Sequence, residues 1–107
     1  MGDNSGILGT MFWSRLVFEV TFVYRYLVMV LRTPTFQPSV IERHRAFLDG
    51  LRSQGKLELA GPFTDGSGGA YILKAANLEE AQALAFADPI YTTRSSVVSV
   101  YEWNTKS

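Results

Sequence analysis

The segment that most constrains this fold is residues 25–32, where apolar side chains occupy both alternating positions of a β-strand. Successive strand residues point to opposite faces of a sheet. Three apolar side chains would therefore lie on each face: Tyr26, Val28 and Val30 on one, and Leu27, Met29 and Leu31 on the other. A sheet that is apolar on both faces has to be covered on both.

The elements that follow are predicted in the order strand, helix, strand, strand, helix, strand. Strands are predicted at 25–32, 56–63, 69–75 and 97–103, with a Gly/Asp-rich hairpin loop at 64–68. The first helix begins at Ser39, whose spacing to Glu42 fits a capping box, and it ends at Gly55. The second begins at Asn77 by the same logic and cannot continue past Pro89. With right-handed crossovers, this order predicts an α+β, ferredoxin-like βαββαβ fold with both helices on one face.

The second face of this sheet has no predicted helix to cover it. A chain of 107 residues is one domain and buries only about two-thirds of its unfolded surface. A second copy of the chain is the economical cover. We therefore expect a homodimer, with further assembly left open.

Residues 1–24 are expected to be an N-terminal extension of a domain that spans 25–104. The first ten residues are Gly-rich and polar, and the rest of the extension suits an added strand or a short helix. Residues 11–31 are apolar enough to suggest a membrane span or signal peptide, but Arg15, Glu19 and Arg25 interrupt them. We expect neither a membrane role nor export.

The charge balance and the missing cysteines exclude several function classes. Ten basic and ten acidic residues cancel, so the chain lacks the basic footprint of a nucleic-acid-binding protein. The absence of cysteine removes disulfides and thiol catalysis, and it is compatible with a cytoplasmic location. With His44 as the single histidine, no metal site is expected.

His44 and Asp88 are the two residues most suited to acid–base chemistry. His44 lies on the apolar stripe of the first helix, where it is either a core histidine or a proton-transfer group. Asp88 is expected to point inward from the end of the second helix, against the negative end of the helix dipole. It is either a helix-stop residue before Pro89 or a carboxylate that needs a donor. The available donors are His44, Arg94 and backbone amides.

The expected helix directions separate these two side chains. If both helices run the same way from level starts, the axial offset between His44 and Asp88 is about 7–8 Å at 1.5 Å per residue. The two side chains then meet only if the helices are staggered or a ligand bridges them.

Two further groups are candidates for contact with a ligand. Gly61, Pro62 and the glycines of the following hairpin could bring backbone amides close to a ligand, although such a pattern more often marks a plain hairpin. Tyr26 and Tyr71, with Tyr101 and Trp103, could line an aromatic pocket or could pack in the core or a dimer interface.

Several short motifs, taken together and in order, resemble those of the YciI-like family. They are RYLVMVLR at 25–32, HRAFL at 44–48, GKL at 55–57, AGPFTDGSGG at 60–69, LEEA at 78–81 and ADP at 87–89. The resemblance implies a dimeric α+β barrel, in which two such sheets pack face to face, and a pocket that holds the His44–Asp88 pair. It also implies relatives that act on chlorinated hydroxyquinol rings and muconolactones, mostly without metals or organic cofactors.

The expected function is therefore proton transfer on a small cyclic or aromatic compound, such as dehydrochlorination or isomerisation. In this lyase- or isomerase-type enzyme His44 is the acid–base residue, Asp88 orients it, and Tyr26, Gly61, Pro62 and Tyr71 contact the substrate, without a cofactor. The alternative is a non-catalytic module that binds a small ligand or self-associates.

Overall fold

The computed structural model describes residues 24–106 of the chain. The expected extension lies outside the described residues except for Tyr24, which is the first residue of strand β1. The apolar segment 11–31, which could suggest a membrane span, lies outside the described residues up to residue 23. Within residues 24–106, no helix is long and apolar enough to cross a bilayer.

Four antiparallel strands form a single sheet in the spatial order β2-β3-β1-β4. The strands are β1 (Tyr24–Arg32), β2 (Leu57–Pro62), β3 (Gly68–Ala75) and β4 (Ser96–Trp103). The helices are α2 (Val40–Ser53), α3 (Leu78–Ala85) and α4 (Pro89–Thr92). This topology confirms the predicted α+β, ferredoxin-like fold.

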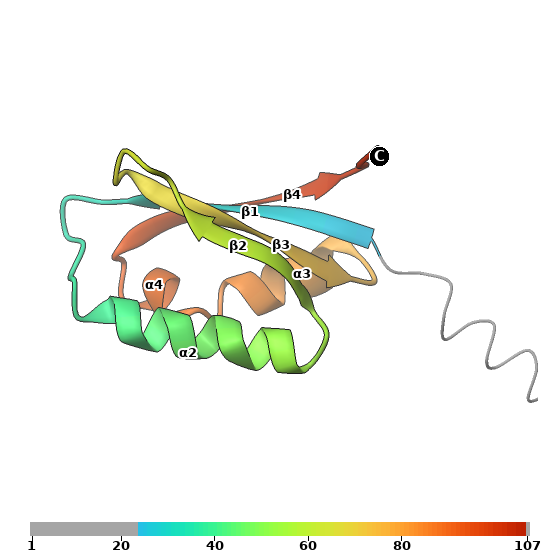
Figure 1. Ribbon diagram of the computed structural model, residues 1–107, viewed down its shortest axis with the longest axis horizontal. Helices are drawn as coiled ribbons and strands as arrows, with labels where there is room; N and C mark the ends of the chain where they lie inside the picture. The colour runs from blue at the N-terminus through green and yellow to red at the C-terminus, as the bar shows by residue number, and fades with distance from the viewer. Residues whose placement is uncertain (1–23, 107) are drawn as a thin grey trace, which may run out of the picture.

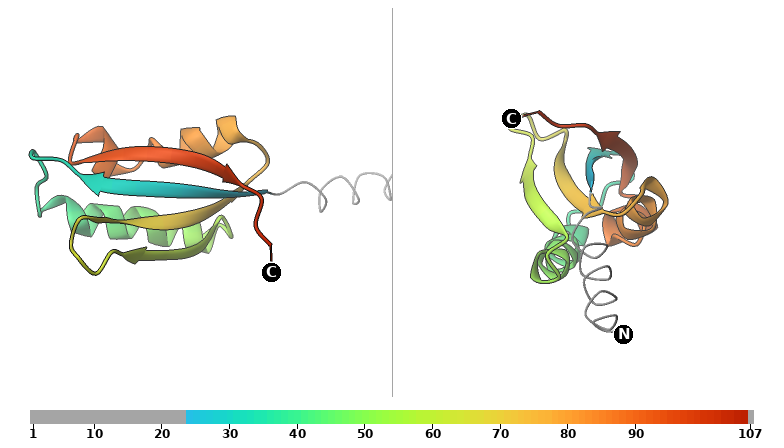
Figure 2. Two further views of the ribbon diagram at one scale, coloured as in Figure 1. Left: turned by 90° about the horizontal axis from the view of Figure 1, so that it is seen from above. Right: turned by 90° about the vertical axis from the view of Figure 1, so that its right-hand side faces the viewer.

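All three helices lie against one face of the sheet, as Figure 1 and the end-on view of Figure 2 show. The core forms between them. Tyr26, Val28 and Val30 from β1 are buried there, as predicted, together with apolar residues from the other strands and from the helices: Val40, Leu51, Leu57, Tyr71, Leu73, Ala75, Ala81, Ala85, Ile90 and Val98. Because Pro89 is tolerated at the first turn of a helix, it begins α4, a helix that the sequence analysis did not predict.

The two predicted helix caps have different outcomes. The prediction for Asn77 is confirmed, because its side chain accepts a hydrogen bond from the Glu80 N–H at 2.8 Å. The capping box predicted at Ser39 is wrong. Ser39 itself has a helical backbone conformation and its side chain makes no cap bond. A turn before the helix supplies the bonds instead, since the Val40 N–H donates to the Gln37 carbonyl.

The helix directions also differ from the prediction. β2 and β3 form a hairpin, so β3 runs antiparallel to β1. β1 and β3 therefore end at opposite edges of the sheet, and the connections that follow them start from opposite edges. As a result, α2 and α3 run in opposite directions and not in the same one. This brings the beginning of α2 close to α4, which follows the end of α3, and α2 and α4 are in contact.

The face of the sheet away from the helices is apolar, and no described element covers it (Figure 1). Its central row runs across all four strands through Leu59, Ile72, Leu27 and Tyr101, which are paired neighbours. Leu59 is 64% exposed and Tyr101 54%. Leu31 and Val97 are paired on the same face, four residues further along β1 than Leu27, and both are also exposed. The two-sided apolar pattern of residues 25–32 therefore corresponds to one buried face and one open face.

Gly68 is a position where the fold has no room for a side chain. Its φ of +155° is rarely adopted by other residues, and a Cβ there would overlap the carbonyl oxygen of Val30 on the neighbouring strand. We expect Gly68→Ala to lower the unfolding free energy by roughly 3 kcal/mol, because the central β1–β3 pairing has to move. Gly66→Ala is the matched control.

Gly66 also has a positive φ, but a Cβ there meets open space. Gly66→Ala should therefore cost only about 1 kcal/mol of backbone strain. Urea unfolding followed by circular dichroism measures both values. Equal losses in the two variants would contradict the proposed overlap at Gly68.

Candidate active site

A pocket of about 380 Å³ lies between α2 and the β2–β3 hairpin. One stripe of α2 forms its helical wall, with Ile41, Arg45, Leu48 and Arg52 at spacings of three and four residues. The opposite wall consists of the ends of β2 and β3, and the floor includes the inward-facing residues of the central strands. This size suits one small ring compound with its substituents.

His44 lies on the pocket wall and pairs with Asp88. The His44 Nδ1 atom is 2.8 Å from Asp88 Oδ2, and the histidine side chain is 19% exposed. An ionised carboxylate only accepts hydrogen bonds, so Nδ1 carries the hydrogen opposite it. Nε2 is then the nitrogen that is left with a free lone pair for a ligand. The antiparallel helices make this direct contact possible without a bridging ligand.

Asp88 lies at the start of α4 and not at the end of α3. It is the N-cap of α4, and its Oδ1 accepts a hydrogen bond from the Ile90 N–H at 2.9 Å. The carboxylate is completely buried. The expected conflict with the negative end of a helix dipole is therefore wrong, because α3 ends at Ala85 and a new helix begins after Asp88. Arg94, another expected partner, is exposed and makes no ion pair with Asp88 in the described part of the chain.

Tyr71 lies next to this pair. Its ring centroid is 6.3 Å from that of His44, and its side chain lines the pocket. Burial, then the charge of the Asp88 carboxylate and the closeness of that carboxylate to the hydroxyl, raise the pKa of the Tyr71 phenol above its ordinary value, so the hydroxyl keeps its proton. The Tyr71 oxygen makes no well-formed hydrogen bond with a described group, but the Asp88 carboxylate is the acceptor beside it.

Ser96 is a pocket residue that the sequence analysis did not single out. It is 5% exposed, it lines the pocket, and its hydroxyl has no hydrogen-bond partner among residues 24–106. Ser96 is the first residue of β4 and is paired with Arg32. No sequence signal distinguishes Ser96 from Ser95 or Ser99, since only the sheet register brings it to the pocket.

The remaining predicted ligand contacts divide into two groups. Gly61, Pro62 and Tyr71 line the pocket, whereas Tyr26 is buried and does not. Gly61 contributes no free amide, however. The Phe63 N–H donates to the Gly68 carbonyl, and hydrogen-bonded pairs alternate along an antiparallel ladder. The Gly61–Ala70 pair is therefore a bonded one, so its N–H is used within the sheet.

The pocket offers acid–base chemistry and no evident metal ligands. Residues 24–106 contain no group of three or more His, Asp or Glu side chains that could hold a metal ion. The reactive group is one imidazole held by a buried carboxylate. This pair can accept a proton from a ligand and return it.

Comparison with known proteins identifies relatives over most of the chain. A family model described as the YCII-related domain matches residues 25–104. The uncharacterized protein YjpA of Bacillus subtilis (strain 168) is 39% identical over 84 residues, which are 78% of this chain and 99% of that protein.

Solved structures are also similar to this chain, and the first of them shares its fold. The first is the 5-chloro-2-hydroxyhydroquinone dehydrochlorinase of Burkholderia phenoliruptrix AC1100 in complex with 2,5-dihydroxybenzoquinone, with a TM-score of 0.61 and 19% identity. The match covers 77% of this chain and 95% of the dehydrochlorinase. The hydroxynitrile lyase of Passiflora edulis matches with a TM-score of 0.42 and 15% identity, over 79% of this chain and 96% of the lyase.

Proposed function

The chain belongs to the YCII-related domain family, and on that premise we propose that residues 25–104 form an enzyme that transfers protons on a small cyclic or aromatic compound. The observation that carries this proposal is the 2.8 Å pairing of His44 with Asp88 on the wall of a ligand-sized pocket. The dehydrochlorinase relative supplies the reaction class, which we extend to this chain as a lyase- or isomerase-type activity.

His44 is the general base in the proposed reaction. Its Nε2 removes a proton from the substrate while Asp88 holds Nδ1–H and stabilises the imidazolium that forms. In an elimination, the electron pair of the broken C–H or O–H bond forms a new double bond as chloride leaves with the electrons of the C–Cl bond. In an isomerisation, the imidazolium returns the proton to a different carbon. Neither route needs a cofactor or a metal.

A non-catalytic ligand-binding or accessory module is the alternative. A histidine packed solidly against Phe47 and Leu51 would have favoured that alternative. His44 instead reaches a pocket and has one nitrogen free, which supports a catalytic role. We also propose that the protein acts in the cytoplasm.

The protein is further proposed to work as a homodimer through its open sheet face. The row Leu59–Ile72–Leu27–Tyr101 crosses the whole sheet, and the exposed apolar residues beside it extend it into a patch. Monomeric proteins rarely leave a large contiguous apolar patch in water. A two-fold dimer would place the same patch of both copies against each other.

Replacement of His44 tests the proposed chemistry. A panel of chlorinated hydroxyquinols and small lactones, incubated in D2O, reports proton transfer by deuterium uptake in NMR spectra and elimination by chloride release. For any compound that reacts, His44→Gln should lower kcat/KM by at least about a hundredfold, because glutamine cannot exchange the proton. Turnover that is unchanged in this variant would contradict the assignment of His44.

The control variant is Arg43→Gln, one residue earlier on α2. Arg43 is exposed and does not line the pocket. Arg43→Gln should keep wild-type kcat/KM and wild-type urea unfolding. Urea unfolding of His44→Gln should show a folded protein under the assay conditions, although the loss of a bond to the buried Asp88 carboxylate lowers its stability.

A further inference from the structure

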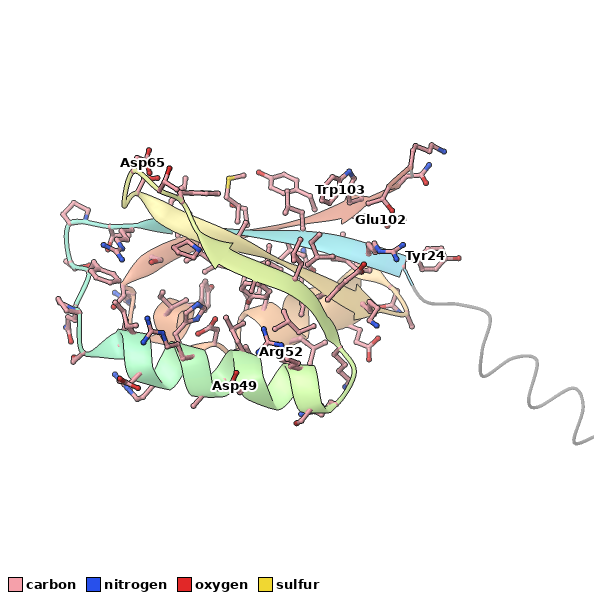
Figure 3. The ribbon with its side chains drawn as sticks, in the orientation of Figure 1. Tyr24, Asp49, Arg52, Asp65, Glu102 and Trp103 are labelled. Carbon is pink, nitrogen blue, oxygen red and sulfur yellow. The ribbon has the colours of Figure 1, made fainter. Side chains whose placement is uncertain are left out.

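The charged residues at the pocket are mostly cationic, although the chain as a whole is neutral. Arg32, Arg45 and Arg52 line it, and Asp49 is the only acidic residue among the lining side chains of the described chain. Asp49 forms an ion pair with Arg52 at 2.9 Å, as their neighbouring positions on α2 allow (Figure 3). One pair thus cancels, and Arg32 and Arg45 outnumber the remaining nearby carboxylate, the buried Asp88 that is bonded to His44.

These two arginines come from different elements that line the pocket. Arg45 belongs to the α2 stripe, one turn before Asp49. Arg32 ends β1, and its guanidinium lies 4.2 Å from the centre of the Phe36 ring, another lining residue. This contact restrains the guanidinium while leaving its N–H groups available. Within residues 24–106, no carboxylate lies within ion-pair distance of either arginine.

Two other lining residues, Tyr71 and Ser96, have fully buried hydroxyl oxygens without a hydrogen-bond partner in the described residues. They do not lie side by side on the sheet, because Ser96 pairs with Arg32 and Tyr71 pairs with Val28, four residues earlier on β1. Arg32 and Arg45, by contrast, are exposed side chains of the pocket lining. The lining groups that are open to a charged ligand are therefore cationic.

We propose that the substrate is a small anionic ring compound whose charged group is held by Arg32 and Arg45. This inference deepens the proposed function, because it names the class of substrate for that site, and it rests on that function. Guanidinium groups bind carboxylates and other planar anions through paired N–H donors. The expected specificity is therefore for a negative charge on the ring compound.

Binding of matched probes tests the charge preference without any turnover. 4-Hydroxybenzoate and 4-hydroxybenzamide have nearly the same shape and differ by one negative charge. We expect isothermal titration to give the benzoate a Kd at least about tenfold lower at low salt. The preference should shrink as sodium chloride is raised, because salt screens exposed arginines.

Variants locate the source of the preference. Arg45→Gln and Arg32→Gln should each reduce the ratio of the two Kd values, and the double variant should bring it close to one. Arg43→Gln adds the same charge change to α2 away from the pocket and should leave the ratio unchanged.

Three outcomes would overturn the proposal. The first is equal affinity for the benzoate and the benzamide. The second is no binding of either probe up to about 20 mM, which is the range of negligible affinity. The third is a preference that survives in the double arginine variant. His44→Gln should keep the preference for the anion, so a protein that binds as expected but never transfers protons would refute the proposed function alone.

Discussion

Asp88→Ala should lower the unfolding free energy by roughly 3 kcal/mol, the largest stability effect that we expect from a single side chain at the pocket. The carboxylate is fully buried and makes two hydrogen bonds, to the Ile90 N–H and to His44 Nδ1. Alanine would leave the Ile90 N–H buried without a partner, remove the cap of α4 and open a small cavity. Urea unfolding measures the loss.

Asp49→Ala is the matched control for that stability effect. Asp49 is also an acidic residue with one ion-pair partner, but its side chain is largely exposed (Figure 3). Exposed ion pairs contribute about 0.5 kcal/mol. A loss in Asp88→Ala that is no larger than this would contradict the structural role of the buried carboxylate.

Asp88→Asn separates the role of Asp88 in positioning from its role in folding. The asparagine oxygen can still accept from the Ile90 N–H, so we expect a smaller loss of stability than in Asp88→Ala. Its amide nitrogen would then face His44 Nδ1 as a donor, which moves the histidine hydrogen to Nε2. The proposed base would be lost, and kcat should fall by about a hundredfold or more with KM little changed. Wild-type kcat in a folded Asp88→Asn protein would contradict the proposal.

Leu27→Glu should dissociate the proposed homodimer, with a dimer Kd raised by about a thousandfold or more. Leu27 lies at the centre of the open face, between Ile72 and Tyr101 in the same row. A two-fold interface would bury this carboxylate twice, without a partner, at a cost of several kcal/mol. Every 1.4 kcal/mol is a tenfold change in affinity. Sedimentation equilibrium over a range of protein concentrations gives both dissociation constants.

Ala46→Glu controls for the added charge. Ala46 is exposed on α2, away from the open sheet face, so this variant should stay as dimeric as the wild type. Leu27→Glu should unfold at a urea concentration near that of the wild-type monomer, because its side chain faces water in a lone protomer. A wild-type chain that remains monomeric at high micromolar concentration would contradict the dimer itself.

Much of the fold follows from local pattern. Three features appear in the structure as predicted, and each is a property of a few neighbouring residues. They are the apolar side chains on both faces of strand 25–32, the Gly/Asp-rich hairpin and the Asn77 cap. The strand ends predicted from the sequence lie within a residue or two of those observed. The start of α2 was less predictable, because a backbone turn supplies its capping bonds and the Ser39 side chain does not.

The site was only partly predictable. Composition and helical spacing made His44 and Asp88 the candidates, but their contact depends on the helix directions, which the sequence analysis took to be the same. The short helix α4 was missed because the pattern after Ala85 resembles a simple stop before Pro89. Tyr26 was a candidate ligand contact by residue type, and burial in the core removes it from the pocket wall.

The sequence by itself therefore determined the order of the elements, the sheet with two apolar faces and the pair of residues capable of acid–base chemistry. These features are encoded in residue type and in periods of two or three to four residues. The tertiary structure alone decided that His44 meets Asp88 directly, that Ser96 and Tyr71 share their pocket, and that Arg32 and Arg45 leave it cationic. Such contacts join residues far apart in the chain, and only strand register and helix direction bring them together.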